Sequence, residues 1–251
     1  MKKTMYALVA LMLTLVLSGC AFVVRAIDDE RAYEASQLME SVNKIEVRYT
    51  YILSTPDGDV EMELGSSGTG TVIAVDVDDE SSLVLTAGHV CDVEQEMMSP
   101  FGMLKLSESS MSIITFRGTR LEAFPLVSSM SPDVCVLYVK GIAGPTVEIA
   151  TELPPLGSAV MNAACPLGFK GDKTLHVSTG LYEGVLVEEV NKYVMSSVPI
   201  APGSSGSALV YEGKIIGVVV MGTPRFQHLA ISTHLEDVIE AVKLARELWV
   251  R

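Results

Sequence analysis

Short apolar runs separated by turn residues make up most of the chain between residues 45 and 232. Many of these runs are rich in β-branched residues, which favour strands. The runs are residues 45–53, 70–77, 82–86, 112–116, 134–139, 159–163, 185–190, 193–197, 208–211 and 215–221. Turn formers such as Pro56-Asp57-Gly58 and Ser66-Ser67-Gly68 lie between them. This pattern predicts an antiparallel all-β fold, a sandwich or a barrel, rather than alternating strands and helices.

Two segments have helical spacing instead. Residues 27–42 place apolar residues at intervals of three and four among acidic ones, which predicts a short helix. Residues 233–249 begin with the Thr-x-x-Glu spacing of a capping box and then repeat apolar positions at helical intervals. This second helix would close the chain. His234, in its first turn, is expected at the surface.

The first 19 residues have the composition of a bacterial export signal. A basic start precedes the almost unbroken apolar run of residues 6–17, which is too short to span a membrane comfortably. The segment Leu17-Ser18-Gly19-Cys20 resembles the lipobox of bacterial lipoproteins, where cleavage leaves the cysteine as a lipidated N-terminus. We therefore expect a signal peptide over residues 1–19, a lipid on Cys20 that holds the protein at a membrane, and a partly helical spacer over residues 20–44. The alternative is an uncleaved apolar anchor.

The exported part of the chain would be strongly acidic. The whole sequence has 18 basic and 31 acidic residues; removing residues 1–19 takes away two lysines and no acid, so the formal charge changes from −13 to −15. Nucleic acid is therefore not expected as a partner, because phosphate binding requires a basic surface. About 230 residues remain, enough for one large all-β domain or two subdomains.

Three cysteines remain besides Cys20, namely Cys91, Cys135 and Cys165. An oxidising compartment would permit one disulfide and leave one thiol. The short distance in sequence between His89 and Cys91 raises the question of zinc, but no C-x-x-C pair supplies half of a site. No glycine-rich phosphate loop occurs either. We expect no metal and no cofactor.

Three residues in the order His, Asp, Ser suggest nucleophilic catalysis. His89 follows a buried run, Asp133 precedes another, and Ser205 lies in the small-residue stretch 202–207. A serine hydroxyl becomes a good nucleophile when an imidazole accepts its proton, and the imidazole needs a carboxylate to fix its tautomer. Each residue alone has an ordinary interpretation: a backbone-bonded histidine, a turn aspartate, a turn serine. Their joint occurrence favours catalysis.

The surrounding motifs resemble those of the trypsin-like serine peptidases, nearest to the exported bacterial Deg/HtrA-type and glutamyl-endopeptidase-like branch. In chain order they are Gly68-Thr69-Gly70-Thr71-Val72-Ile73, Thr86-Ala87-Gly88-His89, Asp133-Val134-Cys135-Val136-Leu137, the strand and turn of residues 157–168, Gly203-Ser204-Ser205-Gly206-Ser207, and Gly217-Val218-Val219-Val220-Met221-Gly222. The resemblance covers about residues 46–242. It implies a peptidase domain over residues 45–251 with two six-stranded antiparallel β-barrels, at about 45–145 and 146–232, and a closing helix at 233–249.

The resemblance also implies a role for each candidate residue. Ser205 would be the nucleophile, His89 the general base and then acid, and Asp133 the carboxylate that orients the imidazole. The backbone N–H groups of Gly203 and Ser205 would form the oxyanion hole. Because Ser204 stands where trypsin has an aspartate, activation by a freed N-terminus is not expected.

The implied specificity pocket carries no charge. Its walls would be Pro199, Ile200, Val220, Met221 and Gly222. No acid lies near Pro199 to attract Lys or Arg, and Val219 stands where glutamate-specific relatives have a histidine. We expect a preference for small or medium apolar side chains.

The same resemblance suggests a disulfide, because Cys91 and Cys135 each lie two residues after a proposed catalytic residue, on strands whose ends converge at the site. A Cys91–Cys135 bond is the first choice. A Cys91–Cys165 bond and buried free thiols are the alternatives. In the first case Cys165 stays free.

The sequence therefore predicts a serine endopeptidase that hydrolyses exported or envelope proteins through an acyl-enzyme. It would be held by its lipid on the periplasmic or extracellular face of a bacterial membrane. We expect no PDZ domain after the closing helix, unlike in most Deg/HtrA-type enzymes. The alternative is a non-catalytic binding lipoprotein that uses the peptidase fold as a scaffold, because a fold alone does not prove activity.

Overall fold

The computed structural model describes residues 32–55, 58–92, 96–99, 102–170, 175–188, 191–223 and 226–249. The expected signal peptide, Cys20 and residues 20–31 of the spacer lie outside these ranges. The chain divides into two compact units, Met1–Gln37 and Leu38–Arg251. Residues 32–41 are helical, as the spacing over residues 27–42 predicts. Within the described ranges, no helix is both long enough and apolar enough to cross a membrane.

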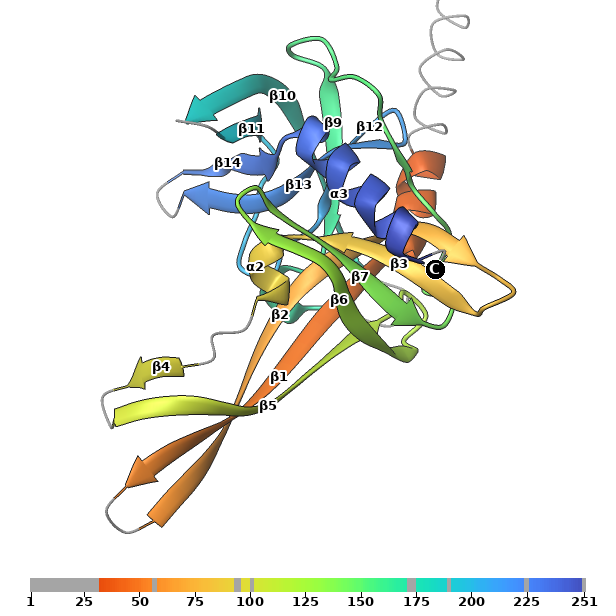
Figure 1. Cartoon of the computed structure of the whole chain (residues 1–251). Helices are drawn as coiled ribbons and strands as arrows, with labels where there is room; N and C mark the ends of the chain where they lie inside the picture. The colour runs from red at the N-terminus through yellow and green to blue at the C-terminus, as the bar shows by residue number, and fades with distance from the viewer. Residues whose placement is uncertain are drawn as a thin grey trace, which may run out of the picture. The chain divides into compact units, whose positions relative to one another are not determined.

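Six antiparallel strands form the first barrel (Figure 1). In spatial order they are β1 (Val42–Thr55), β2 (Gly58–Asp76), β3 (Ser81–Thr86), β7 (Asp133–Lys140), β6 (Arg120–Met130) and β5 (Gly102–Ile114). Pairing of β1 with β5 closes the barrel. A short strand, β4 (Glu96–Ser99), pairs with the beginning of β5 outside the barrel.

Six further strands form the second barrel. In spatial order they are β9 (Ala159–Ala164), β10 (His176–Glu188), β11 (Asn191–Ser196), β14 (Phe226–Thr233), β13 (Lys214–Thr223) and β12 (Ala208–Tyr211). Pairing of β12 with β9 and β13 closes it, and β8 (Glu148–Ile149) runs parallel to β13 outside it. The prediction of two six-stranded antiparallel barrels with a closing helix, α3 (Leu235–Trp249), is confirmed.

Strands β3 and β7 lie at the centre of the first barrel and lead directly to the candidate site. Every residue of β3 is buried, and Leu85, Val136 and Leu137 have no exposed surface. The two strands are covered on both sides, because their inner side chains fill the barrel while α3 packs against β6 and β7. Close packing of this kind fixes the strand ends, and Asp133 is the first residue of β7.

The apolar pattern missed several strands. Strands β4, β6, β8 and β14 were not predicted, and β2 and β10 begin well before the expected starts at residues 70 and 185. Strand β6 contains Pro125, which argues against a regular strand, and the structure accommodates it where the β6–β7 register shifts between Pro125 and Val127. The part of β2 that was not predicted has acidic residues at every second position. Its side chains are mostly exposed, so a search for buried apolar runs takes it for a surface loop.

The start of the closing helix also differs from the prediction. The Thr233 hydroxyl does not cap α3 but donates to the backbone oxygen of Asp133 at 2.5 Å. His234 takes the capping position, where its Nδ1 accepts the N–H of Glu236 at 3.3 Å. His234 is only 7% exposed, so the expectation of a surface histidine was wrong. The residue lies between β14, a strand of the second barrel, and α3, which packs against β6, β7 and β13.

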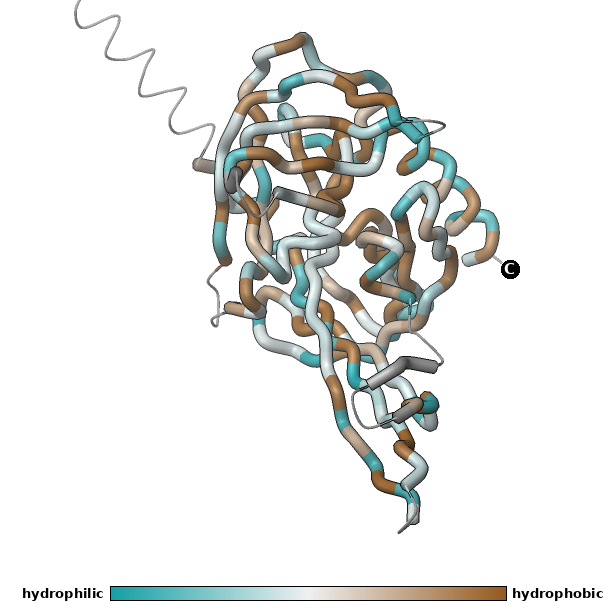
Figure 2. Tube along the Cα trace, turned by 90° about the vertical axis from the view of Figure 1, so that its left-hand side faces the viewer, coloured by the Kyte–Doolittle hydropathy of each residue, from teal (hydrophilic) through white to brown (hydrophobic). Residues whose placement is uncertain are grey.

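Three strands of the first barrel continue outward as an arm, which we define as residues 48–55 of β1, 58–67 of β2 and 103–110 of β5 (Figure 1). Hydrophobic and polar residues alternate along it (Figure 2). One face holds a small apolar cluster of its own, centred on Tyr51, Leu53 and Leu104. In the arm β2 pairs only with β1, because β3 joins β2 only from Thr71 onward.

Candidate active site

His89 lies in a single helical turn, α2 (Gly88–Cys91), which follows the end of β3 at Thr86. The sequence had placed this histidine at the end of the strand itself, so the turn is a correction. The turn packs tightly against β6. A Cβ on Gly88 would lie 2.0 Å from the backbone oxygen of Ser129 and 2.9 Å from Oδ1 of Asp133, so only glycine fits there.

Two hydrogen bonds join His89 to Asp133. Oδ2 of Asp133 lies 2.7 Å from Nδ1 of His89, and Oδ1 accepts the backbone N–H of His89 at 2.9 Å. The histidine side chain is 35% exposed and the aspartate side chain 19% exposed. A carboxylate at Nδ1 favours the tautomer with the proton on Nδ1, which leaves Nε2 able to accept a proton from a neighbour.

A disulfide joins Cys91 to Cys135, as predicted. Cys135 lies on β7 opposite Thr86, but Cys91 lies on α2 and not on a strand as expected. The bond ties the turn that carries His89 to the strand that begins with Asp133. Cys165 is free and buried, and burial raises the pKa of its thiol to about 11.

The loop that carries Ser205 is shaped by backbone hydrogen bonds. Ser204 N–H donates to Ala201, and Ser207 N–H donates to Ser204. Gly206 N–H donates to Val219 of β13 at 2.7 Å. These bonds set the course of the loop between β11 and β12 of the second barrel and join it to β13.

The same loop contacts the first barrel beside the histidine turn. The backbone oxygen of Ser205 accepts the N–H of Thr69 in β2 at 2.8 Å. Gly206 has φ +86°, and a Cβ there would lie 2.0 Å from Oγ1 of Thr86 and 2.2 Å from the backbone oxygen of Thr69. The structure therefore brings residues 205 and 206 against the end of β3, three residues before His89.

The backbone N–H groups of Gly203 and Ser205 donate none of the hydrogen bonds that form the turns of this loop. Gly203 has φ +92°, and a Cβ there would lie 2.7 Å from the backbone oxygen of Cys165, so the position requires glycine. In the described backbone, the turn bonds of the loop are donated by its other N–H groups and not by Gly203 or Ser205. Paired N–H groups of this kind can bind an oxyanion.

Two buried threonines, Thr69 and Thr233, support the site, and the sequence predicted no role at the site for either. Oγ1 of Thr69 donates to the backbone oxygen of Gly203 at 2.8 Å and accepts the N–H of Cys165 at 3.0 Å. Thr233 bonds Asp133 as described above. The sequence offered no clear signal for either, because Thr69 lies among Ser, Gly and Thr residues and Thr233 lies between Ser232 and His234.

Two of the five residues expected to line the specificity pocket lie in contact. A Cβ on Gly222 would lie 2.5 Å from Cδ1 of Ile200. Val220 is 9% exposed and Met221 54% exposed, and Pro199 is partly buried. The Ile200 side chain therefore occupies part of the space beside Gly222.

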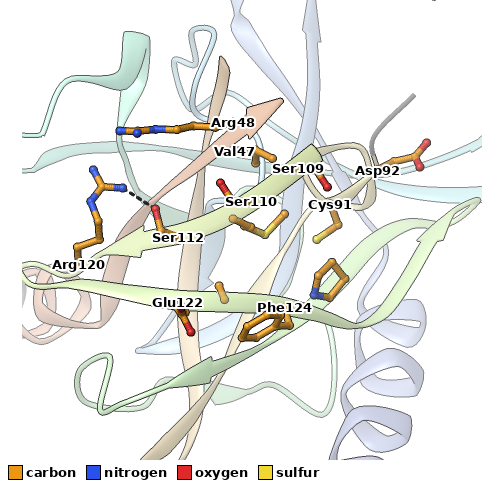
Figure 3. Close-up of a pocket in the computed structure, with 13 residues that line it drawn as sticks. Val47, Arg48, Cys91, Asp92, Ser109, Ser110, Ser112, Arg120, Glu122 and Phe124 are labelled. Atoms are coloured by element: carbon orange, nitrogen blue, oxygen red, sulfur yellow. Dashed lines mark hydrogen bonds between the residues drawn. The ribbon is translucent and has the colours of Figure 1, made fainter. Parts of the chain in front are cut away.

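A separate pocket of about 720 Å³ lies between β5, β6 and the end of α2 (Figure 3). It includes Cys91 and Asp92 at one side and Arg48 and Arg120 at the other, and it lies where β5 and β6 cease to pair beyond Ser112. None of the three candidate catalytic residues lines it. No cluster of three or more His, Cys, Asp or Glu side chains suited to a metal occurs among the residues that the structure describes.

Comparison with known proteins identifies a protein family that matches this chain. The trypsin-like peptidase domain matches residues 68–218, more than half of the chain. A curated relative from Pseudomonas fluorescens, described as a probable periplasmic serine endoprotease DegP-like, is 24% identical over 166 residues. That alignment covers 65% of this chain and only 31% of the relative.

Solved structures share the fold at low sequence identity. The active form of the Rv3671c protease from M. tuberculosis has a TM-score of 0.61 and 17% identity over 84% of this chain and 83% of that one. The serine endoprotease from Yersinia pestis has a TM-score of 0.60 and 18% identity, over 85% and 65% of the two chains. An HtrA-type protease solved with a decapeptide has a TM-score of 0.66 and 16% identity, over 86% and 66%.

Proposed function

The chain belongs to the family of trypsin-like peptidase domains, and from this premise we propose that it is a serine endopeptidase whose catalytic residues are His89, Asp133 and Ser205. The main support is the pair of hydrogen bonds by which the Asp133 carboxylate binds both the ring Nδ1 and the backbone N–H of His89. A histidine that only completed a turn would not need its ring nitrogen fixed by a carboxylate. The contact of residues 205 and 206 with the end of β3 supports the same assignment.

In the proposed mechanism Ser205 Oγ attacks the substrate carbonyl while His89 Nε2 accepts its proton. The negative charge that develops on the carbonyl oxygen is stabilised by the N–H groups of Gly203 and Ser205. Loss of one such donor typically lowers the rate by about 10² to 10³. His89 then gives the proton to the leaving amine, and water hydrolyses the acyl-enzyme with His89 again as base.

The proposed pocket favours small or medium apolar side chains on the acyl side of the cleaved bond. Two observations support this preference. None of the five residues is charged, and the Ile200 side chain lies beside Gly222, where it limits the depth of the pocket. Cleavage sites in a peptide library, read by mass spectrometry, test this. We expect Ala, Val and similar residues before the cut, and enrichment of Lys, Arg or Glu there would contradict the proposal.

We propose that the protein acts on exported or envelope proteins while tethered by a lipid on Cys20. In this arrangement residues 1–19 are the signal peptide, residues 20–44 the spacer and residues 45–251 the peptidase domain. It is supported by the lipobox-like sequence, by a disulfide that suits an oxidising compartment, and by the periplasmic description of the curated relative. Labelled palmitate should enter the wild-type protein in bacterial cells and not the Cys20→Ala variant.

Hydrolysis of an unfolded protein such as β-casein tests the proposed activity. We expect wild-type protein to cut it and Asp133→Asn to lower kcat by about 10⁴, because the amide no longer favours the productive histidine tautomer. Circular dichroism checks that the variant is folded. A folded wild-type protein that cuts neither casein nor the peptide library would support the non-catalytic binding lipoprotein instead.

A further inference from the structure

The arm presents a strand edge with no partner strand among the described elements. Residues 59–67 of β2 pair with β1 on one side, while β3 pairs with β2 only from Thr71. Most of these nine residues are exposed, and Val60 and Leu64 retain 48% and 39% of their surface. An exposed edge is a template for an additional strand.

The hydrogen-bonding direction of this edge follows from Thr69. Its N–H points away from β1, because it donates to the backbone oxygen of Ser205. The register of β1 with β2 is continuous from Val42–Thr71 to Thr55–Gly58, without a bulge. Since direction alternates along a strand, the backbone groups of Glu61, Glu63, Gly65 and Ser67 also point to the open side.

The edge starts at the proposed nucleophile, on the histidine side. A Cβ on Gly68 would lie 3.1 Å from the Ser205 backbone oxygen and 2.9 Å from the side chain of Val90, the residue after His89. In the proposed reaction His89 gives its proton to the leaving amine, so the leaving half of the substrate lies on this side. An extended substrate that leaves the site here runs directly onto the edge.

The rim of this path is apolar. A Cβ on Gly168 would lie 3.3 Å from Oγ of Ser67, which places the turn η1 (Pro166–Gly168) beside the beginning of the edge. Leu167 is 63% exposed with φ +54°, and Phe169 is 72% exposed. Non-glycine residues held at positive φ are uncommon and cluster at functional sites, so this exposed apolar turn is a candidate contact for a bound segment.

The negative charge along the edge of β2 favours a binding partner with positive charge. Asp59, Glu61 and Glu63 share one face of β2 and are exposed, and in the described part of the chain Glu61 and Glu63 form no ion pair. A second copy of this chain pairing edge to edge would bring these like charges together, which is unfavourable. A strand with basic residues at every second position would place cations beside them.

We propose that the free edge of β2, residues 59–67, binds the leaving-group half of an extended substrate as an added strand, with a preference for basic residues at alternate positions. The proposal rests on the proposed peptidase function. The substrates would be unfolded or extended protein segments with a basic stretch after the cleavage site.

Binding to an inactive variant tests the proposal. Full-length protein with Ser205→Ala, in detergent, is titrated into a fluorescein-labelled 16-residue peptide with small apolar residues in its first half and Lys at alternate positions in its second half. We expect this peptide to bind about fivefold more tightly than its counterpart with Glu at those positions. Glu61→Lys with Glu63→Lys should reverse the preference.

The matched control is Glu240→Lys with Glu247→Lys on α3, which changes the net charge by the same amount and should leave the preference unchanged. Amide exchange should slow at Glu61, Glu63 and Gly65 on peptide binding. Equal binding of both peptides, no effect of the Glu61 and Glu63 substitutions, or protection only elsewhere would overturn the proposal. So would a dimer that protects the same amides without peptide. Selective binding by a protein that never cleaves peptides would refute the proposed function and leave this site standing.

Discussion

The two barrels supply the candidate site in different ways. The first barrel contributes side chains, His89 and Asp133, which hold each other and are tied together by the Cys91–Cys135 disulfide. The second barrel contributes a length of backbone around Ser205, whose form depends on turn hydrogen bonds and on glycines that fit where no Cβ can. The first half is fixed by a disulfide and side-chain hydrogen bonds, and the second by backbone hydrogen bonds and close packing around glycines.

This difference implies different weaknesses. A disulfide and two side-chain hydrogen bonds tolerate small shifts of their surroundings, whereas a backbone packed at van der Waals contact does not. Substitutions that add volume should therefore harm the Ser205 loop most, and substitutions that remove a cross-link should harm the His89–Asp133 half.

Gly206→Ala should have the largest effect on stability. The added Cβ meets backbone and hydroxyl oxygens at 2.0–2.2 Å and forces a positive φ on alanine, so we expect a loss of about 3–5 kcal/mol. The control is Gly213→Ala, also at positive φ but with nothing within 4 Å of the new Cβ, where a loss of about 1–2 kcal/mol is expected. Urea unfolding measures the free energy of unfolding of both variants. Equal losses would show that the close packing around Gly206 does not contribute to stability.

Removal of the disulfide should have the next largest effect. The bond links residues 44 positions apart, and Cys91→Ala with Cys135→Ala should lower the free energy of unfolding by about 2–4 kcal/mol. Cys165→Ala, which removes a buried thiol that closes no loop, is the control. If the two losses are alike, the disulfide adds nothing beyond the packing of its sulfurs.

Thr69→Val should cost less, about 1–3 kcal/mol, because it leaves Gly203 O and the Cys165 N–H without their partner. Thr71, on the same strand and equally buried, has a hydroxyl without a partner in the described residues. Thr71→Val should therefore be neutral or slightly stabilising. The pair isolates the hydrogen bond from the change in shape, and a similar loss for both would remove Thr69 from the support of the loop.

Cys165 gives the smallest effect, one of reactivity rather than stability. Burial raises its pKa to about 11, so at pH 8 only about one thiol in a thousand is the reactive thiolate. Alkylation by iodoacetamide at pH 8 should be very slow in native protein and fast in urea. Fast alkylation of the native protein would mean that the second barrel opens beside Gly203.

The centre of each barrel was predictable from the sequence, but the arm was not. Strands β3, β7, β12 and β13 each contain a short run of β-branched and apolar residues, a pattern that predicts a buried strand. The outer part of β2 carries Asp59, Glu61 and Glu63, and its strand character comes from pairing with β1. Local sequence does not encode that long-range pairing.

The site divides in the same way. The order of His89, Asp133 and Ser205 and the Cys91–Cys135 pair could be read from motifs, because the chemistry restricts the residue types. The support from Thr69 and the contact of Ile200 with Gly222 could not, because they depend on which strands meet in space.

The most direct test of the central claim is labelling of the full-length protein with a fluorophosphonate, which reacts with activated serines. The account predicts one adduct, mapped by mass spectrometry to Ser205, that disappears in both Ser205→Ala and His89→Ala while the fold is kept. Absence of labelling in folded wild-type protein, or labelling at Ser205 that survives His89→Ala, would contradict it.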